Sequence, residues 1–238
     1  MSYIPSVVVS NEQVSENYYI LKVRTLRKLV KKPLPPQFSM VWIPGVDLVP
    51  LSYADCSNRL VTFFYKVVGE GTKNLSLRKP GDIIAISEPV GKFFTDIENP
   101  VFLVGGTSIA PIIHYSKYLE NFSGVWGVKS GALAESLIEK FPKLKHLSIV
   151  SEDCTIGFCG KLTDHLDKLR LSSNTTVLTA GPPEMVKAVC RWIKNLGVRS
   201  YVIAETIVKC GLGVCGSCVI NNSLLCRDGP VVDCSVFW

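Results

Sequence analysis

The feature that most constrains this chain is a run of cysteines near its C-terminus. Residues 210–218 read Cys210-Gly-Leu-Gly-Val-Cys215-Gly-Ser-Cys218, and another cysteine follows at Cys226. The spacing C-x4-C-x2-C with a later fourth cysteine is that of thiolate ligands to a [2Fe–2S] cluster. We therefore predict a [2Fe–2S] cluster on Cys210, Cys215, Cys218 and Cys226.

The residues between these cysteines suit a tight wrap around a cluster. Gly211, Gly213 and Gly216 permit backbone conformations that turn N–H groups toward the sulfurs. Asn221-Asn222 stands between two β-like dipeptides and predicts a hairpin turn, which would return Cys226 to the other ligands.

Two alternatives for this site stay open at the sequence level. A structural zinc site usually sets two C-x2-C pairs well apart, whereas here three cysteines and three glycines crowd into nine residues. Cys234 could replace Cys226 as the fourth ligand, although it follows the turn-forming Asp228-Gly-Pro230.

The remaining cysteines do not suggest a second site. Nine cysteines are an odd count, and a chain of this size does not need a disulfide scaffold. Cys154 and Cys159 are interpreted as two loop thiols because no further ligands lie nearby, and Cys190 as a core thiol on a helix. Cys56 is unassigned.

Composition narrows the class of protein. The net charge of +6 arises from 26 basic and 20 acidic residues, a mild excess for a nucleic-acid binder, and the basic stretch at 24–32 is interpreted as a solvated face. No apolar run approaches the roughly 20 residues of a spanning helix. The N-terminus shows no secretory signal. We expect a soluble, cytoplasmic protein that binds neither nucleic acid nor membrane.

Residues 1–96 show the pattern of a small antiparallel barrel. Short runs rich in Val, Ile, Phe and Tyr alternate with turns, and no convincing helix interrupts them. Within 60–67 the residues alternate in two sets, one of which contains Val61, Phe63 and Tyr65. The expected strands are 4–9, 18–23, 38–43, 60–68 and 82–87.

Residues 97–200 change to alternating buried strands and helical patterns, which predicts a parallel sheet flanked by helices. The strand at 101–104 runs into a turn, Gly105-Gly106-Thr107-Ser108, that aims N–H groups at a diphosphate. A second turn begins at Gly181 after the strand at 177–180 and opens a helix over 183–196. Two such strand ends predict a ligand crevice. The remainder, 201–238, is too short for its own core.

Taken together, these parts resemble the ferredoxin reductase superfamily, in the form of the electron-transfer subunit of the two-subunit dihydroorotate dehydrogenase of pyrimidine synthesis. The segments that carry the resemblance span the chain: Gln37 to Asp47, Pro50-Leu-Ser52, Gly69-Glu-Gly71-Thr72, Gly106 to Pro111, Ala180-Gly-Pro, Cys210 to Cys218 and Cys226 to Pro230. The resemblance implies a flavin-binding β-barrel domain at 1–96, an NAD(P)-binding-type α/β domain at 97–200 and a [2Fe–2S] segment at 201–238.

The resemblance also implies which residues hold cofactors. Expected FAD contacts are Pro50, Leu51, Ser52, Tyr65, Lys66, Gly71 and Thr72, and the nucleotide turn contributes Gly105, Gly106 and Thr107. Three positions depart from the family pattern: Val49 where an Arg is frequent, Ser108 where a Gly is common and Ala180 where many members have a Cys. The last two lie at the expected hydride-transfer site, so NAD(P) is left open as a third cofactor.

The function implied is electron transfer between FAD and the cluster, in complex with an FMN-containing catalytic subunit that oxidises dihydroorotate; a heterotetramer is expected. No catalytic acid, base or nucleophile is expected in this chain. Alternatives are a flavin and iron–sulfur subunit of a hydrogenase or a ferredoxin-NADP transhydrogenase and, in another class, a zinc-stabilised binding module.

Overall fold

A computed structural model describes residues 2–237 and divides them into two compact units. The first unit joins the chain up to Phe93 with Thr206–Pro230, and the second joins Phe94–Glu205 with the residues after Pro230. The division into 1–96 for the flavin, 97–200 for the nucleotide and 201–238 for the cluster is a proposal about function. In the described part of the chain, no helix has both the length and the apolar character needed to cross a membrane.

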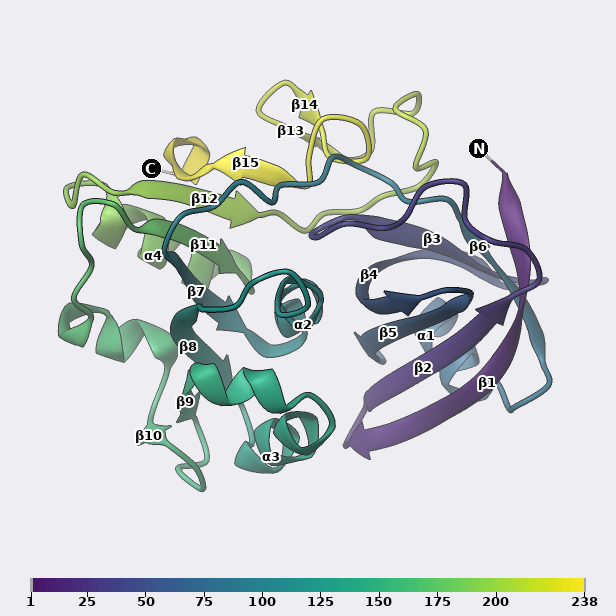
Figure 1. Cartoon of the computed structure of the whole chain (residues 1–238), viewed down its shortest axis with the longest axis horizontal. Coiled ribbons are helices and arrows are strands. Elements are labelled where there is room, and N and C mark those ends of the chain that lie inside the picture. The colour runs from purple at the N-terminus through teal and green to yellow at the C-terminus, as the bar shows by residue number, and fades with distance from the viewer. Residues whose placement is uncertain (1, 238) are drawn as a thin grey trace. The chain divides into compact units, whose positions relative to one another are not determined.

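The first unit contains a closed antiparallel barrel, which confirms the predicted fold (Figure 1). Its strand order is β1-β2-β5-β4-β3-β6. The strands are β1 (Tyr3–Ser15), β2 (Tyr18–Thr25), β3 (Phe38–Ile43), β4 (Asp47–Ser57), β5 (Leu60–Lys66) and β6 (Ile83–Ser87).

The barrel core follows the alternation seen in the sequence. Val61, Phe63 and Tyr65 of β5 all point into one buried cluster with residues from the other strands. Phe64, on the opposite face, is also buried, and its ring stacks on Tyr18 at a centroid distance of 5.9 Å. A strand with two covered faces reads as a near-continuous apolar run, which is why β5 was recognisable.

Two elements of this unit were missed by the sequence analysis. The expectation that no helix interrupts the strands is wrong, because α1 (Glu70–Ser76) lies between β5 and β6. The strand β4 was not among the expected strands, since Pro50 and its polar neighbours obscure the pattern. In the structure β4 pairs with both β3 and β5.

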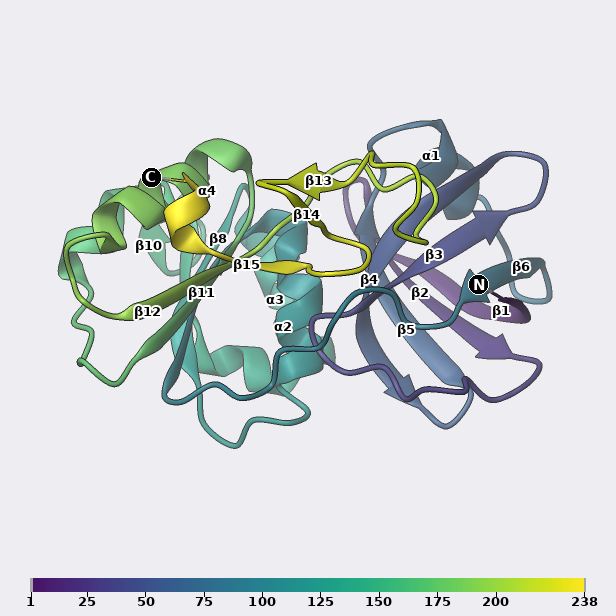
Figure 2. The same cartoon turned by 90° about the horizontal axis from the view of Figure 1, so that it is seen from above.

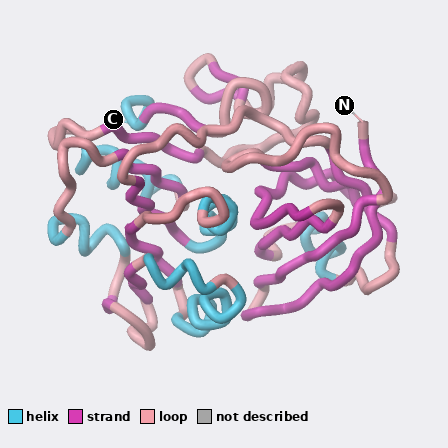
Figure 3. Tube along the Cα trace, in the orientation of Figure 1, coloured by secondary structure: helices cyan, strands magenta, loops and turns pink. Residues whose placement is uncertain are grey.

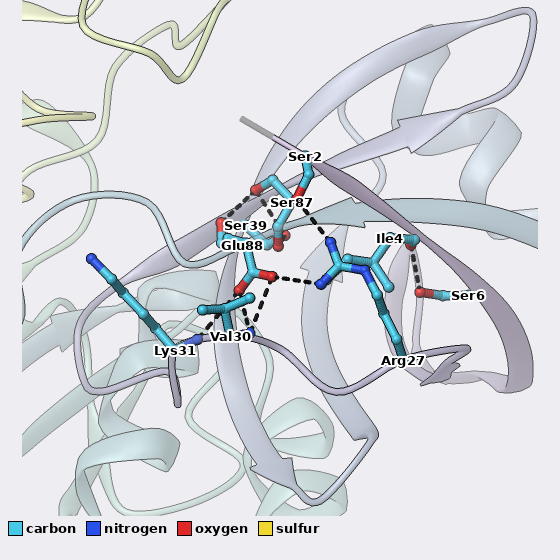
Figure 4. A network of polar contacts seen from close by, with 9 residues as sticks. All are labelled: Ser2, Ile4, Ser6, Arg27, Val30, Lys31, Ser39, Ser87 and Glu88. Atoms are coloured by element: carbon cyan, nitrogen blue, oxygen red, sulfur yellow. Dashed lines mark hydrogen bonds and ion pairs between the residues drawn. The ribbon is translucent and has the colours of Figure 1, made fainter.

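The basic stretch is anchored to the barrel by one carboxylate (Figure 4). Glu88 accepts hydrogen bonds from the backbone N–H of Val30 at 3.0 and 3.1 Å and from the Arg27 guanidinium at 3.3 Å. Arg27 also donates to Ser2 Oγ at 2.8 Å. The basic side chains are exposed, as expected of a solvated face.

The second unit is built on a seven-stranded sheet of order β10-β9-β8-β7-β11-β12-β15. All neighbouring strands are parallel except β12 and β15. The strands are β7 (Pro100–Gly105), β8 (Ser123–Val128), β9 (Ser148–Ser151), β10 (Phe158–Cys159), β11 (Thr176–Ala180), β12 (Arg199–Ile203) and β15 (Val231–Asp233). The predicted parallel sheet is confirmed, with one antiparallel edge strand added.

Helices cover both faces of this sheet, with α4 on one side and α2 and α3 on the other, as the turned view in Figure 2 and the cyan segments of Figure 3 show. Val189 and Ile193 of α4 pack with Leu162 and Leu166 against the sheet. The helical elements are η1 (Gly106–Ile109), α2 (Ala110–Tyr115), α3 (Gly131–Lys140), η2 (Pro142–His146), η3 (Leu162–Lys168), α4 (Pro183–Ile193) and η4 (Cys234–Phe237).

Four of the cysteines outside the 210–226 run form disulfides, which corrects the sequence analysis, and Cys56 is free. Cys190 is in the core but is bonded to Cys234, and neither side chain is exposed. Cys154 and Cys159 also form a disulfide rather than two free loop thiols. Because Cys234 is held in the second unit by Cys190, the alternative that it is the fourth metal ligand is wrong.

Candidate iron–sulfur and flavin sites

The cysteine segment Thr206–Pro230 belongs to the same unit as the barrel. It contains one small hairpin, formed by β13 (Val219–Ile220) and β14 (Ser223–Leu224) (Figure 2). The turn residues Asn221 and Asn222 have φ of +43° and +65°, the left-handed values that a two-residue hairpin turn needs. The predicted hairpin is therefore confirmed, and Leu225 donates its N–H to Cys218 O at 3.1 Å just beyond it.

The four thiols predicted as ligands fall into two pairs. Cys218 Sγ and Cys226 Sγ are 3.4 Å apart and buried, and the thiols of Cys210 and Cys215, in a more exposed position, are close enough to affect each other's pKa. Two thiolates on one tetrahedral metal ion lie about 3.8 Å apart when each metal–sulfur bond is about 2.3 Å. The distance between Cys218 and Cys226 is therefore close to that of two thiolates on one metal ion.

The choice between iron and zinc depends on the spacing of the donors along the chain. Among residues 2–237, no three His, Cys, Asp or Glu side chains are placed to hold a single metal ion. A structural zinc site usually sets two C-x2-C pairs well apart. The C-x4-C-x2-C spacing followed by Cys226 instead fits the thiolate ligands of a [2Fe–2S] cluster.

Backbone N–H groups point at these sulfurs. Leu212 donates to Cys210 Sγ at 3.3 Å, and Gly213 donates to Cys226 Sγ at 3.1 Å. Gly211 and Gly213 have φ of +64° and +75°, which only glycine adopts readily. The expected role of these glycines in turning donors toward sulfur agrees with this geometry.

Hydrogen bonding and burial give two of these thiols different acidities. The N–H of Leu212, with those of Cys215 and Val214, lowers the pKa of Cys210 to about 6. Desolvation, followed by the neighbouring Cys218 thiol, raises the pKa of Cys226 to about 11. Cys210 is therefore the more readily ionised of the two, and Cys226 must lose its proton when a metal binds.

The segment is seated on the strand end that follows β6. Gly91 donates its N–H to Cys226 O at 3.1 Å, and Gln37 Nε2 donates to Gly91 O at 2.7 Å. Gly91 has φ of +81°, and a Cβ at this position would lie 2.7 Å from Gly229 O. Only glycine allows the segment to approach this closely.

A short backbone connection joins this seat to the predicted flavin residues. Val90, next to Gly91, exchanges hydrogen bonds with Phe38 at 2.8 and 3.3 Å, and Phe38 pairs with Ser52 in the β3–β4 register. Ser52 and Cys226 are therefore linked through paired backbone within one unit.

The predicted flavin residues divide by the face of the barrel that they occupy. Leu51 and Tyr65 point into the buried barrel core, whereas Pro50 is exposed and Ser52 and Lys66 are half-buried. Tyr65 donates its hydroxyl to Asn11 Oδ1 at 3.1 Å, and its pKa is raised by desolvation. Lys66 Nζ lies 5.2 Å from the Tyr18 ring centroid. Side-chain contact with a flavin outside the barrel is thus restricted to Pro50, Ser52 and Lys66.

Two of the predicted FAD contacts, Gly71 and Thr72, lie at the start of α1. Thr72 Oγ1 accepts hydrogen bonds from Val68 and Gly69 at 2.9 and 3.2 Å and donates to Gly69 O, so its hydroxyl shapes the turn. A Cβ on Gly71 would lie 2.5 Å from Asp47 Oδ2 and 2.8 Å from Val49 Cγ1. The nearest side chains at this turn are therefore an acid and an aliphatic group, and the sequence analysis did not anticipate Asp47.

The predicted nucleotide residues lie in the second unit, where β7 and β11 are paired side by side. The turns at Gly105 and Gly181 meet there: a Cβ on Gly181 would lie 3.2 Å from Gly105 N, and Met185 packs against both glycines. Gly106 has φ of +55° and opens η1 with Thr107. The juxtaposition of the two turns agrees with the expected crevice.

Ser108, one of the departures from the family pattern, has a partner that the sequence analysis missed. Its hydroxyl donates to Glu205 Oε1 at 2.7 Å. Desolvation raises the pKa of Glu205 above its usual value, although the hydrogen bond from Ser108 opposes this shift. No local sequence signal links two residues this far apart in the chain. Ala180, another departure, is completely buried.

Comparisons with known proteins agree with this arrangement. Residues 205–236 match the family described as the iron-sulfur cluster binding domain of dihydroorotate dehydrogenase B. The chain is 31% identical to the dihydroorotate dehydrogenase B (NAD(+)) electron transfer subunit of Caldanaerobacter subterraneus, over 97% of this chain and 94% of the relative.

Solved structures agree as well. A chain of the NADH-dependent reduced ferredoxin-NADP oxidoreductase superposes with a TM-score of 0.82 at 26% identity, covering 97% of this chain and 88% of that one. A ferredoxin NADP+ reductase from Neisseria gonorrhoeae with bound FAD and NADP has the same fold, with a TM-score of 0.72 at 15% identity over 83% and 92% of the two chains.

Proposed function

Because the chain belongs to the family of dihydroorotate dehydrogenase B electron transfer subunits, we propose that it moves electrons between FAD on the barrel and a [2Fe–2S] cluster on Cys210, Cys215, Cys218 and Cys226. The observation that carries this proposal is the arrangement of four thiols as two pairs within the barrel unit.

When bound, the cluster supplies a one-electron carrier and the flavin a carrier of one or two electrons. The chain's own residues position these groups. Leu212 and Gly213 direct N–H groups at sulfur and so stabilise negative charge there. Gly91 donates a hydrogen bond to Cys226 O and is itself held by Gln37. The residue before Gly91 pairs with Phe38, and Phe38 pairs with Ser52. This seat favours a fixed separation between the two cofactors.

For FAD, Pro50, Ser52 and Lys66 are the proposed side-chain contacts, with Leu51, Gly71 and Thr72 contributing backbone. Tyr65 is proposed to act from inside the barrel, where its hydrogen bond to Asn11 fixes β5. Asn11 also donates to the carbonyls of Leu75 and Arg78 at 2.8 and 3.2 Å, which holds the end of α1. The negative charge of the Asp47 carboxylate would repel a diphosphate bound at the start of that helix.

For the nucleotide, the proposed contacts are Gly105, Gly106 and Thr107 at the carboxyl end of β7. Ligands of open parallel sheets bind where neighbouring strands lead to opposite sides, and here β7 leads toward β8 while β11 lies on its other side. NAD is the nucleotide for which the related dihydroorotate dehydrogenase B (NAD(+)) electron transfer subunits are named. The partner proposed is an FMN-containing catalytic subunit that oxidises dihydroorotate, in a heterotetramer.

The test is anaerobic co-purification of the chain with its partner, followed by cofactor analysis and titration with NADH and with dihydroorotate. We expect about two irons and two acid-labile sulfides per chain, FAD on this chain and FMN on the partner. Dihydroorotate should bleach the flavin and cluster absorbance of the complex.

The test variant is Cys215→Ser, and its matched control is Cys56→Ser, because Cys56 is a free cysteine outside the proposed ligand set. Only the first should lose the cluster spectrum. A partner without FMN that is inert toward dihydroorotate would favour the ferredoxin-NADP type of complex instead. A colourless protein loaded with zinc would contradict the proposal altogether.

A further inference from the structure

The exposed disulfide Cys154–Cys159 closes a short loop, Glu152–Gly160, which we call the clasp loop. The loop begins at the carboxyl end of β9 and returns to the sheet as β10, where Phe158 and Cys159 pair with Val150 and Ser151. Both cysteines of the clasp loop are exposed. Neither is a proposed cluster ligand.

The clasp loop holds one carboxylate on the first residue of α3. Asp153 accepts hydrogen bonds from the N–H of Gly131 at 3.1 and 3.2 Å, and from Thr155 N and Oγ1 at 3.2 and 2.8 Å. Its own N–H donates to Lys129 O at 3.2 Å. Asp153 thus ties the loop both to the end of β8 and to α3.

The clasp loop packs closely against the first residue of α3. A Cβ on Gly131 would collide with Thr155 Oγ1 and lie 2.5 Å from Ile156 Cγ2. Cys154 has φ of +59°, a left-handed conformation that residues other than glycine, asparagine and aspartate rarely adopt. The disulfide therefore adds a covalent restraint to a backbone conformation that Cys154 adopts at a cost.

The position of Asp153 at the edge of the sheet suggests a role in nucleotide binding. In dinucleotide-binding folds, an acidic side chain about 20 residues after the glycine turn accepts hydrogen bonds from a ribose, at the end of the strand beside the turn. Here that place, after β8, carries Lys129 and Ser130. Asp153 follows the neighbouring parallel strand, β9, and so lies at the same edge of the sheet.

The two disulfides of the second unit differ in access. Cys190 and Cys234 are completely buried, whereas Cys154 and Cys159 are exposed. Thiol–disulfide exchange requires that the attacking thiolate reach a sulfur atom. A reductant acting on the folded protein should therefore open the clasp loop and leave the buried disulfide intact.

We propose that Cys154–Cys159 is a redox-sensitive clasp that fixes Asp153 at the ribose end of the nucleotide crevice, so that its reduction weakens nucleotide binding. This inference rests on the proposed binding of NAD at the carboxyl edge of the sheet. The reductant is a cellular dithiol of the thioredoxin class. Its two thiols give two electrons and two protons, the Cys154–Cys159 bond breaks to two thiols, and the dithiol becomes a disulfide.

The experiment uses the holoprotein, oxidised or treated with a dithiol under native conditions, and ADP-ribose as the probe. Alkylation and peptide mass mapping should show Cys154 and Cys159 labelled only after treatment, and Cys190 and Cys234 unlabelled. Calorimetry should then show ADP-ribose binding about fivefold weaker after reduction, because a preorganised acceptor is lost. Flavin and cluster absorbance should be unchanged.

A Cys154→Ser/Cys159→Ser variant should bind ADP-ribose like the reduced wild type and should not respond to the dithiol. Asp153→Asn should also weaken binding, while its disulfide still opens. Equal affinity in the oxidised and reduced states, or tighter binding after reduction, would refute the clasp while leaving the proposed function intact. Absence of ADP-ribose binding in both states would overturn the nucleotide part of the proposed function, and the clasp with it.

Discussion

Replacing Gly91 by alanine should release the cysteine segment from its seat without unfolding the barrel. Gly91 has φ of +81°, and a Cβ there would lie 2.7 Å from Gly229 O and 3.0 Å from Pro230 Cδ. Gly45 provides a matched control, because its φ is +74° and nothing lies within 4 Å of a Cβ at that position.

The magnitudes separate the two variants. A left-handed conformation costs a non-glycine residue about 1–2 kcal/mol, and this term is common to Gly91→Ala and Gly45→Ala. Only Gly91→Ala adds overpacking against Gly229, about 1–3 kcal/mol, and weakens the hydrogen bond to Cys226 O, about 1 kcal/mol. The additional destabilisation of the seat is therefore about 2–4 kcal/mol, or about 30-fold to 1,000-fold in its opening equilibrium.

The assay is the rate of cluster loss to an iron chelator, followed by visible absorbance, with urea unfolding measured in parallel. Gly91→Ala should lose its cluster at least about 30-fold faster than Gly45→Ala, while both barrels unfold at similar urea concentrations. Equal rates of cluster loss in the two variants would refute the reasoning that Gly91 is the seat of the segment.

Three further outcomes are expected. Cys234→Ala should keep the cluster, whereas Cys226→Ser should lose it, and loss of the cluster in Cys234→Ala would contradict this assignment. Because Cys234→Ala also breaks the Cys190–Cys234 disulfide, which spans 44 residues of sequence, it should lower the free energy of unfolding by about 4 kcal/mol in denaturant titrations. Asp47→Asn should tighten FAD binding by about 0.5–1 kcal/mol in a fluorescence titration, because a carboxylate beside Gly71 repels a diphosphate, and unchanged affinity would place the diphosphate elsewhere. Desolvation raises the pKa of Asp153, but the hydrogen bonds from Thr155, Ser130 and Gly131 outweigh it and lower that pKa to about 2. The contribution of the Asp153 carboxylate to stability is therefore present above pH ~4 and is lost as the pH falls toward 2. The urea midpoints of wild type and Asp153→Asn should converge with falling pH, and midpoints that stay parallel would contradict this role.

Local chemistry explains what could be predicted. The cluster ligands lie within a short stretch, and their spacing, the glycines between them and the Asn221-Asn222 turn are all local features. The barrel strand at Leu60–Lys66 was visible because its side chains alternate against one core. In each of these cases, neighbouring residues carry the whole signal.

Pairings between distant residues could not be predicted in this way. The disulfide between Cys190 and Cys234 depends on β15 returning beside β12, and the contact between Ser108 and Glu205 depends on β7 and β12 ending at the same edge of the sheet. From the sequence, Cys190 was therefore interpreted as a core thiol and Cys234 as an alternative fourth ligand, and Glu205 was missed.

The sequence by itself predicted the iron–sulfur chemistry, the order of barrel and parallel sheet, and the family resemblance, because these depend on residue type, spacing and periodicity. Only the tertiary structure decided that the four thiols form two pairs, that Tyr65 faces the barrel core and that Asp47 lies against Gly71. Those facts depend on which residues the folded chain brings together, and contacts across a fold are set by packing and not by local propensity.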